Sequence, residues 1–268
     1  MIRTSTRYLR VARSFAVNCL VRDMSFRADF LMRMVTDLMW YVMLVFFYHI
    51  IFTRMTSEIA GWTYDRMLVL LGTVYAGNKL FQGFFLGNCN ELSEQIRTGN
   101  LDFVLLKPIN PQFMVSLRYI DYSSLINVPV GLAMVVYGAV RLGIDFSPIV
   151  WAEYLLLLGA GVVILYALMF MLASTSVWMV RNEGLTMLYF STTSFARYPA
   201  EIYRLRWLSV ILTYVIPMVV VANSPAKVLF GDLQAWAAGY AVAAAIVLLW
   251  LSNRFFVLAL RSYRSASS

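Results

Sequence analysis

Residues 154–180 read YLLLLGAGVVILYALMFMLASTSVWMV, 27 consecutive residues without a charged side chain. A helix needs about 20 mostly apolar residues to cross a bilayer core of about 30 Å, so this stretch predicts a membrane-spanning helix. The whole chain has the same character: 61% of its 268 residues are hydrophobic, 13% are charged, and the mean hydropathy is +0.71. No water-soluble domain covers so much apolar surface, and the sequence therefore predicts an all-α integral membrane protein.

Three further uncharged stretches predict spans: 38–53, 122–140 and 233–253. The first is short, and we expect Arg33 and Asp37, four residues apart, to pair at its inner boundary. Two more candidates are less regular, because one is interrupted by Lys79 and the other has only 13 uncharged residues, 184–196. The six predicted spans are 33–53, 66–90, 116–140, 152–180, 183–198 and 233–257.

The distribution of basic residues favours six crossings over seven. With six spans and both termini in the cytoplasm, 14 of the 22 basic residues fall on the inner side. A seventh crossing through the uncharged run 207–226 would move the last three arginines outside, against the positive-inside bias. Because that run contains Pro217 and Pro225, we predict that 199–231 forms a re-entrant pair of half-helices at the outer face, and that 258–268 is a cytoplasmic tail.

Residues 1–29 predict a basic amphipathic helix that lies in the headgroup plane. Its apolar positions recur at helical spacing and its arginines share another face: Leu9, Ala12, Phe15, Ala16, Cys19 and Leu20 against Arg3, Arg7 and Arg10. The alternative is that these charges only set topology. The net charge of +8 has the same explanation in cytoplasmic anchoring and anionic lipids, which we favour over nucleic-acid binding. Cys19 and Cys89 are expected inside, as reduced thiols.

A charged segment, 91–111, interrupts the apolar runs and reads ELSEQIRTGNLDFVLLKPINP. We expect it to continue the helix of the second span and to stop at Gly99. The two prolines after its short apolar element suggest a rigid elbow that a soluble partner grips at the membrane surface. Just beyond it, Arg118 and Asp121 are expected to pair where the third span opens.

The second predicted span carries a polar stripe of Tyr75, Asn78, Lys79 and Gln82. A lysine deep in the bilayer costs about 2.5–3.5 kcal/mol, so we expect the stripe to face protein or water. Gly83 and Gly87 form a GxxxG pair, which is a weak signal for close helix packing.

No reaction centre is evident in the sequence. It has no GxxxxGK[ST] phosphate loop, so we do not expect this chain to bind ATP by that motif. His49 is the only histidine, and the acidic residues lack a paired spacing, which argues against a metal cluster or a catalytic triad. The chain is not expected to be an enzyme or to hold a cofactor.

Three runs together resemble permease subunits of bacterial ABC-2-type transporters over nearly the whole chain. They are IRTGNLDFVLLKPINPQF at 96–113, RYPAEIYRLRWLSVILTYVIPMVVVANSPAKVLFG at 197–231 and ALRSYRSASS at 259–268. The resemblance implies a six-helix half-transporter with an N-terminal amphipathic elbow helix, a cytoplasmic coupling helix between spans 2 and 3, and outer re-entrant helices between spans 5 and 6. It also implies pairing with a second permease, identical or homologous, and docking of separate ATPase subunits that hold the ATP and Mg²⁺.

The resemblance also implies residue roles. It places the ATPase contact at Glu91, Glu94, Gln95, Arg97, Gly99, Leu101 and Asp102. It places the outer gate at Pro199, Glu201, Arg204, Pro217 and Pro225. Our hypothesis for the translocation pathway is that Tyr75, Asn78, Lys79 and Gln82 face Thr192, Thr193 and Ser194. Lys79 then attracts an anionic group of the cargo, or alternatively reaches the surface or pairs with an acidic residue of the partner permease.

By analogy the chain is expected to serve export of a small or amphipathic cargo across the bacterial inner membrane, with both termini cytoplasmic. Two other functions stay open. A secondary transporter driven by an ion gradient usually shows internal repeats and acidic residues near the midplane of the membrane. We find no repeat in the sequence, and the acidic residues all fall near span ends: Asp37, Asp121, Glu153, Glu183 and Asp232. A non-transporting membrane anchor or assembly protein needs no polar face within its spans, yet the second span has one.

Overall fold

The computed structural model describes residues 2–54, 58–179, 183–203 and 205–263, and this part of the chain contains helices and no strands. The α-helices are α1 (Ile2–Ser25), α2 (Arg27–Arg54), α3 (Tyr64–Phe81), α4 (Gly87–Thr98), α5 (Leu101–Leu105), α6 (Pro111–Ser116), α7 (Tyr122–Ile126), α8 (Val128–Arg141), α9 (Pro148–Ser174), α10 (Glu183–Thr193), α11 (Arg206–Val210), α12 (Met218–Phe230) and α13 (Ala235–Ser262). Turns of π-helix follow α3 at Gln82–Leu86 and α11 at Ile211–Val215.

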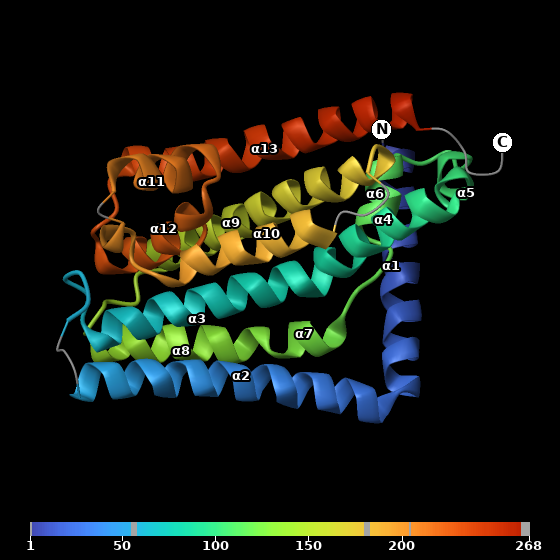
Figure 1. The fold of residues 1–268 in the computed structure, drawn as a ribbon. Coiled ribbons are helices and arrows are strands. Elements are labelled where there is room, and N and C mark those ends of the chain that lie inside the picture. Colours follow the sequence, from blue (N-terminus) through green and yellow to red (C-terminus); the bar gives the residue numbers. More distant parts are fainter. Residues whose placement is uncertain (1, 55–57, 180–182, 204, 264–268) are drawn as a thin grey trace.

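The long helices form a bundle, and α1 crosses one end of it. Figure 1 shows α2, α3, α8, α9, α10 and α13 running side by side, with α1 at nearly a right angle to them. The elements α4, α5, α6 and the last turn of α13 lie at the same end, which we name the α1 end. The connections from α2 to α3 and from α8 to α9 lie at the opposite end, with α11 and α12.

Four helical segments are long and apolar enough to cross a membrane: Arg27–Arg54, Tyr122–Arg141, Pro148–Val177 and Ala235–Ser262. A fifth candidate is the bent pair Trp207–Val215 and Met218–Phe230. These segments make the chain a multi-pass α-helical membrane protein, whereas the count of six crossings stays a prediction. The helices that correspond to predicted spans 2 and 5 are absent from this set because α3 carries Asp65, Arg66 and Lys79 and α10 is only 11 residues long.

The centre of the bundle is α3, whose residues from Met67 to Gly77 are all buried. It packs against α8 through two glycines: a Cβ added at Gly72 would lie 2.7 Å from the carbonyl oxygen of Gly131. The helices approach this closely because neither position carries a side chain. The GxxxG pair behaves differently, since Gly83 packs against Leu125 while Gly87 has open space around it.

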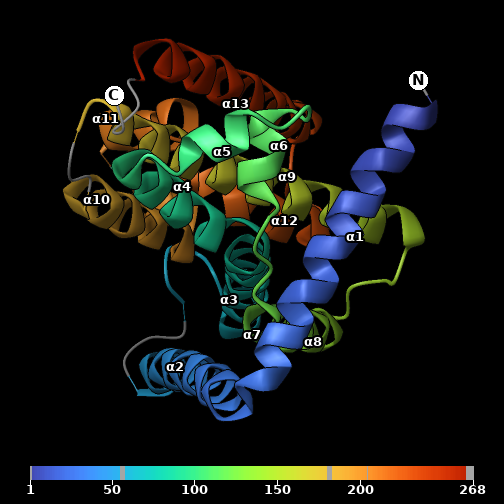
Figure 2. The same cartoon turned by 90° about the vertical axis from the view of Figure 1, so that its right-hand side faces the viewer.

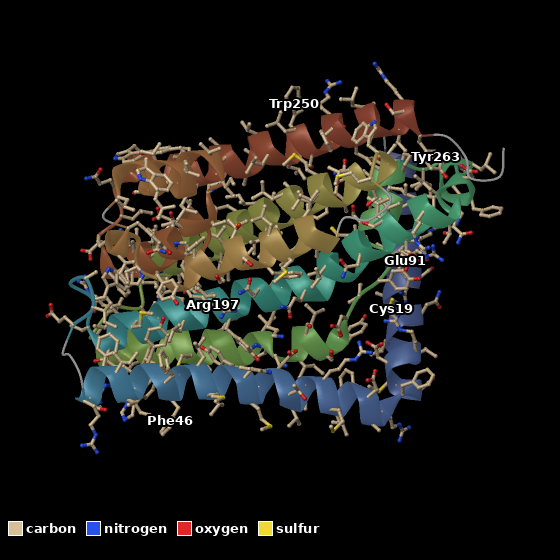
Figure 3. The ribbon with its side chains drawn as sticks, in the orientation of Figure 1. Cys19, Phe46, Glu91, Arg197, Trp250 and Tyr263 are labelled. Carbon is tan, nitrogen blue, oxygen red and sulfur yellow. The ribbon has the colours of Figure 1, made fainter. Side chains whose placement is uncertain are left out.

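In contrast, α2 stands at the edge of the bundle, as Figure 2 shows. Only Phe30, Tyr41 and Tyr48 of its 28 residues are buried. Its outer face carries large exposed apolar side chains, such as Phe46, which Figure 3 shows pointing away from the other helices. A helix face of this kind is typical of contact with lipid or with a second membrane protein.

The crossing helix α1 is fixed to the segment between α6 and α7. The Tyr122 hydroxyl donates to the Ala16 carbonyl at 3.1 Å, and the Ile120 amide donates to Cys19 Sγ at 3.4 Å. Cys19 is buried as the apolar pattern predicted, but Leu9 is 68% exposed. The apolar face of α1 therefore lies partly against protein and partly open, as expected for an interfacial helix.

The predicted break between 199 and 231 is present. The π-helical turn Ile211–Val215 is followed by Ile216 and Pro217, and the helical segments on either side are bent by 82° relative to one another. Proline has no amide hydrogen and disfavours helix in the residue before it, which accounts for the bend. The re-entrant depth of this pair stays a prediction.

Two predicted ion pairs are wrong. Arg33 binds Asp29 at 2.7 Å, so the expected partner Asp37 is left to another helix. Asp121 caps α7 by accepting from the Ser123 amide, and its carboxylate also accepts from two serine hydroxyls. Arg118 lies over the ring of Tyr119 instead, and the helix of the third span begins at Tyr122.

Candidate functional site

The polar stripe lines a slot between α2 and α3. Tyr75, Asn78, Lys79 and Gln82 all border this cavity of about 440 Å³, so the predicted grouping is present. Across from them, α2 contributes Asp37, Trp40, Tyr41, Met43, Leu44 and Phe47. We call this cavity the α2–α3 slot.

Lys79 is buried in an ion pair within the chain. Its Nζ lies 2.5 Å from Asp37 Oδ2 and donates to Gln82 Oε1 at 2.8 Å. The Lys79 side chain is 6% exposed, which corrects both alternatives for it: it neither reaches the surface nor depends on an acidic residue of a partner chain. Removing Asp37 would leave the Lys79 charge buried without its partner, at a cost of about 3–5 kcal/mol.

Two stacked tyrosines form part of the slot wall. The rings of Tyr41 and Tyr75 lie 3.8 Å apart between α2 and α3. Among the described atoms, neither buried hydroxyl has a hydrogen-bond partner. An unpaired buried hydroxyl costs about 1–3 kcal/mol, so these two groups can gain from a polar ligand atom.

A second cavity, of about 660 Å³, lies at the α1 end and is lined by charged groups that include Arg22, Arg33 and Asp121. Asp37 and Gln82 border this polar cavity as well as the α2–α3 slot. The Lys79–Asp37 pair therefore stands between a charged cavity and an aromatic one.

The fifth-span residues do not share the slot within one chain. The hydroxyls of Thr192, Thr193 and Ser194 donate to carbonyls of their own helix, at 2.6–2.9 Å. Ser194 lines a different, open groove beside α4. Facing of these residues across a permease pair stays a prediction. Arg197, near the end of the predicted fifth span, borders the slot as well.

The coupling segment extends from the stripe without a helix break. The α3 helix, the π-helical turn Gln82–Leu86 and α4 are continuous, and Gly99 ends α4 with φ 76°, as predicted. Glu94 and Arg97 lie exposed on α4 and pair at 2.6 Å. Their hydrogen bonds lower the pKa of Glu94 and raise the pKa of Arg97.

Several predicted contact residues of this segment face inward. Gln95 and Leu101 are buried, at 4% and 0% exposure, so they support the segment and present no surface to a partner. Glu91 is half-buried and accepts a hydrogen bond from Gln95. Half-buried Asp102 raises the pKa of Tyr263, after burial as the larger cause. Figure 3 shows Tyr263 beside α5, so the end of α13 reaches this segment.

The exposed surface of α5 was missed. Phe103 and Leu106 are 68% and 81% exposed at the tip that α4 and α5 form beyond the bundle. The helical spacing in LDFVLL was the available signal, because Leu101 and Val104, three residues apart, are buried, while Phe103 and Leu106, also three apart, are exposed.

The predicted outer-gate residues gather at the opposite end. Glu201 accepts from Trp62 Nε1 at 3.0 Å and pairs with Lys227 at 2.6 Å. Asn223 of α12 clamps the same segment: its Oδ1 accepts from the Ala200 amide at 2.9 Å, and its Nδ2 donates to the Tyr198 carbonyl at 3.1 Å.

The prolines of the predicted gate lie inside the protein. Pro199 is buried between the two Asn223 contacts, and Pro217 and Pro225 are buried as well. Arg204 lies outside the described residues. In the described part of the chain no three His, Cys, Asp or Glu side chains gather to hold a metal ion.

The fold and these sites define a multi-pass α-helical membrane protein with polar cavities between its helices and a projecting segment at one end. The family model of the ABC-2 family transporter proteins matches residues 38–267, and the chain belongs to this family. It is therefore a membrane permease component of an ABC transporter. Neither a curated protein nor a solved structure matches the chain.

Proposed function

We propose that this chain is the permease subunit of an ATP-driven exporter, that it crosses the membrane six times, and that it forms the cargo route together with a second permease. ATP and Mg²⁺ bind to separate ATPase subunits. One observation carries the proposal: a single uninterrupted helix links the buried stripe to the projecting tip. This helix runs from Tyr64 to Thr98 through the π-helical turn.

That helix is suited to transmit force. Its 35 residues span about 50 Å at 1.5 Å per residue. Lys79 sits directly before the π-helical turn, and Glu94 and Arg97 sit beyond it. Single π turns inside helices often mark functional sites because they change the direction of the helix locally. A movement of α4 then shifts the Lys79–Asp37 contact. The projecting tip and the α2–α3 slot are coupled in this way through one helix.

The tip is suited to dock a soluble ATPase. Phe103 and Leu106 are exposed apolar side chains of this segment, which also carries the exposed charges of Glu94, Arg97 and Lys107. Apolar anchors within a polar rim are the usual composition of a protein interface. The α1 end is then cytoplasmic, in the bacterial inner membrane, with α1 in the headgroup layer.

Co-purification with the ATPase encoded beside this chain tests the proposal. The double variant Phe103→Glu/Leu106→Glu places two carboxylates at the tip, and we expect it to lose the ATPase while inserting normally. The matched control, Phe146→Glu/Ile149→Glu, changes two other exposed apolar residues at the opposite end and should retain the ATPase. No ATPase on the unaltered chain, or retention by the tip variant, would overturn the proposal.

The Lys79–Asp37 pair also favours a second candidate, a proton-coupled secondary transporter, because acidic residues within membrane spans are typical of proton relays. Transport in proteoliposomes separates the two. The exporter requires ATP and is blocked by vanadate, whereas a gradient-driven transporter stops when an ionophore dissipates the gradient.

A further inference from the structure

We infer that the α2–α3 slot binds an amphipathic anion, a molecule with an acidic head group and an apolar tail. The inference rests on the proposed function only where it treats this ligand as cargo. Binding itself needs neither ATP nor the ATPase. Three features of the molecule support it: the walls of the slot, the charge of the slot and the neighbouring polar cavity.

The walls suit an apolar tail. Trp40, Met43 and Phe47 border the slot and are 70%, 66% and 56% exposed. They belong to the helix at the edge of the bundle, so the slot opens where a membrane lipid would lie against the protein. The α3 wall adds Leu71 and Val74, which continue the apolar lining inward.

The polar groups of the slot suit an anionic head. Lys79 and Arg197 border it with a single carboxylate, that of Asp37, so cations outnumber anions two to one. Hydrogen-bond donors lie around them: the Asn78 amide and the unpartnered hydroxyls of Tyr41 and Tyr75. A phosphate or carboxylate head group matches this set because it accepts several hydrogen bonds and carries the missing charge.

Asp37 has a second possible ion-pair partner, Arg33, when the anion binds Lys79. It is 34% exposed, and it borders the polar cavity together with Arg33, which lies one helical turn earlier on α2. Residues four apart on a helix are neighbours, so Asp37 can exchange Lys79 for Arg33 when Arg33 releases Asp29, whose carboxylate is 58% exposed and stays solvated. The Arg33–Asp37 pair that the sequence predicted is therefore the arrangement we expect when a ligand occupies the slot.

A second copy of the chain is the competing occupant of this edge. Such a copy would bring the apolar side chains of its own α2, but the two carboxylates of that helix, Asp29 and Asp37, are already paired within their own chain with Arg33 and Lys79. The charge of the slot therefore favours the amphipathic anion. The experiment includes this occupant as an outcome.

Binding is measured on the full chain in nanodiscs of phosphatidylcholine, without ATPase or nucleotide. Three probes are compared: a single-chain lysolipid with a phosphate monoester head, its phosphocholine counterpart, and glycerol phosphate without a tail. We expect the phosphate lysolipid to bind about tenfold more tightly than the phosphocholine lysolipid, since one buried charge-assisted bond distinguishes them. Glycerol phosphate should not bind measurably.

The double variant Lys79→Met/Asp37→Asn removes the pair without leaving a buried charge, so it should fold. It should bind the phosphate monoester lysolipid no more tightly than the phosphocholine lysolipid. The control Lys107→Met/Arg261→Gln removes two exposed cations at the α1 end and should keep the preference for the phosphate lysolipid. An unchanged preference in the first variant would show adventitious binding to basic flanks and overturn the inference. The inference would also be overturned if no probe bound and the variant Met43→Cys formed a disulfide between two copies, because a second copy would then cover the slot.

Because no ATPase is present, loss of this binding and loss of ATPase docking are separate results. Retained docking with no probe binding rejects the amphipathic ligand and leaves the exporter standing. Probe binding without any ATPase association rejects the exporter and leaves the amphipathic ligand standing.

Discussion

Lys227 Nζ lies 2.6 Å from a carboxylate oxygen of Glu201, and this pair joins α12 to the short segment that precedes α11. The other carboxylate oxygen of Glu201 accepts from Trp62, in the connection between α2 and α3. Three stretches of the chain therefore meet at one acidic side chain. Beside it, Asn223 binds both Tyr198 and Ala200, so a small polar network fixes the segment that is predicted as the outer gate to α12.

Asn223→Ala should weaken this network more than Glu201→Gln. Asn223 is 3% exposed, and its removal strands two backbone groups at a cost of about 1–3 kcal/mol. Glu201 is 42% exposed and its amide analogue can still accept from Trp62, so we expect a loss below about 1 kcal/mol. SDS titration in mixed micelles measures both, and hydrogen exchange at residues 198–203 should quicken mainly in Asn223→Ala. Equal effects would contradict the network.

Asp37→Asn should destabilise the chain strongly, whereas Lys79→Met and the double variant should be milder. Asp37→Asn leaves the buried Lys79 charge without its partner, at a cost of about 3–5 kcal/mol, whereas Lys79→Met leaves Asp37, which is 34% exposed and borders the polar cavity, and the double change leaves neither charge. The free energies of unfolding of the four proteins form a double-mutant cycle. Additive losses would show that the 2.5 Å contact contributes little.

Gly161→Ala should destabilise the contact between α9 and α12. A Cβ at Gly161 would lie 2.6 Å from the carbonyl oxygen of Val221, which is backbone and must move, at a cost of about 1–3 kcal/mol. That carbonyl is one that Pro225, lacking an amide hydrogen, cannot bond within α12. Gly159→Ala is the control on the same helix, because it has open space and alanine favours helix. Thermal melting of both variants checks the difference, and equal melting temperatures would refute it.

Leu106→Cys and Ile149→Cys should react with a membrane-impermeant thiol reagent from opposite sides. The two positions are 81% and 79% exposed at the two ends of the bundle, while Cys19 and Cys89 are buried and give little background. We expect labelling of Ile149→Cys in intact spheroplasts and of Leu106→Cys only after permeabilisation. The reverse pattern would put the coupling tip outside the cell and remove its access to ATP.

The sequence by itself determined the class of the protein and its local breaks. Apolar length and composition indicate membrane helices because the bilayer imposes them on any chain of this character. The stop at Gly99 and the bend at Pro217 were predictable because the backbone of the residue itself, or of its neighbour, causes them. The grouping of Tyr75, Asn78, Lys79 and Gln82 followed from helical spacing alone.

Only the tertiary structure decided the partners. Asp37 pairs with Lys79, not with Arg33, because α2 lies beside α3 with the two side chains at the same depth, and helix spacing carries no information on that alignment. Burial of Gln95 and Leu101 depends in the same way on what α4 and α5 pack against. Arg197 reaches the slot from 118 residues beyond Lys79 along the chain. Contacts between distant segments are set by packing of whole helices, and local sequence does not specify them.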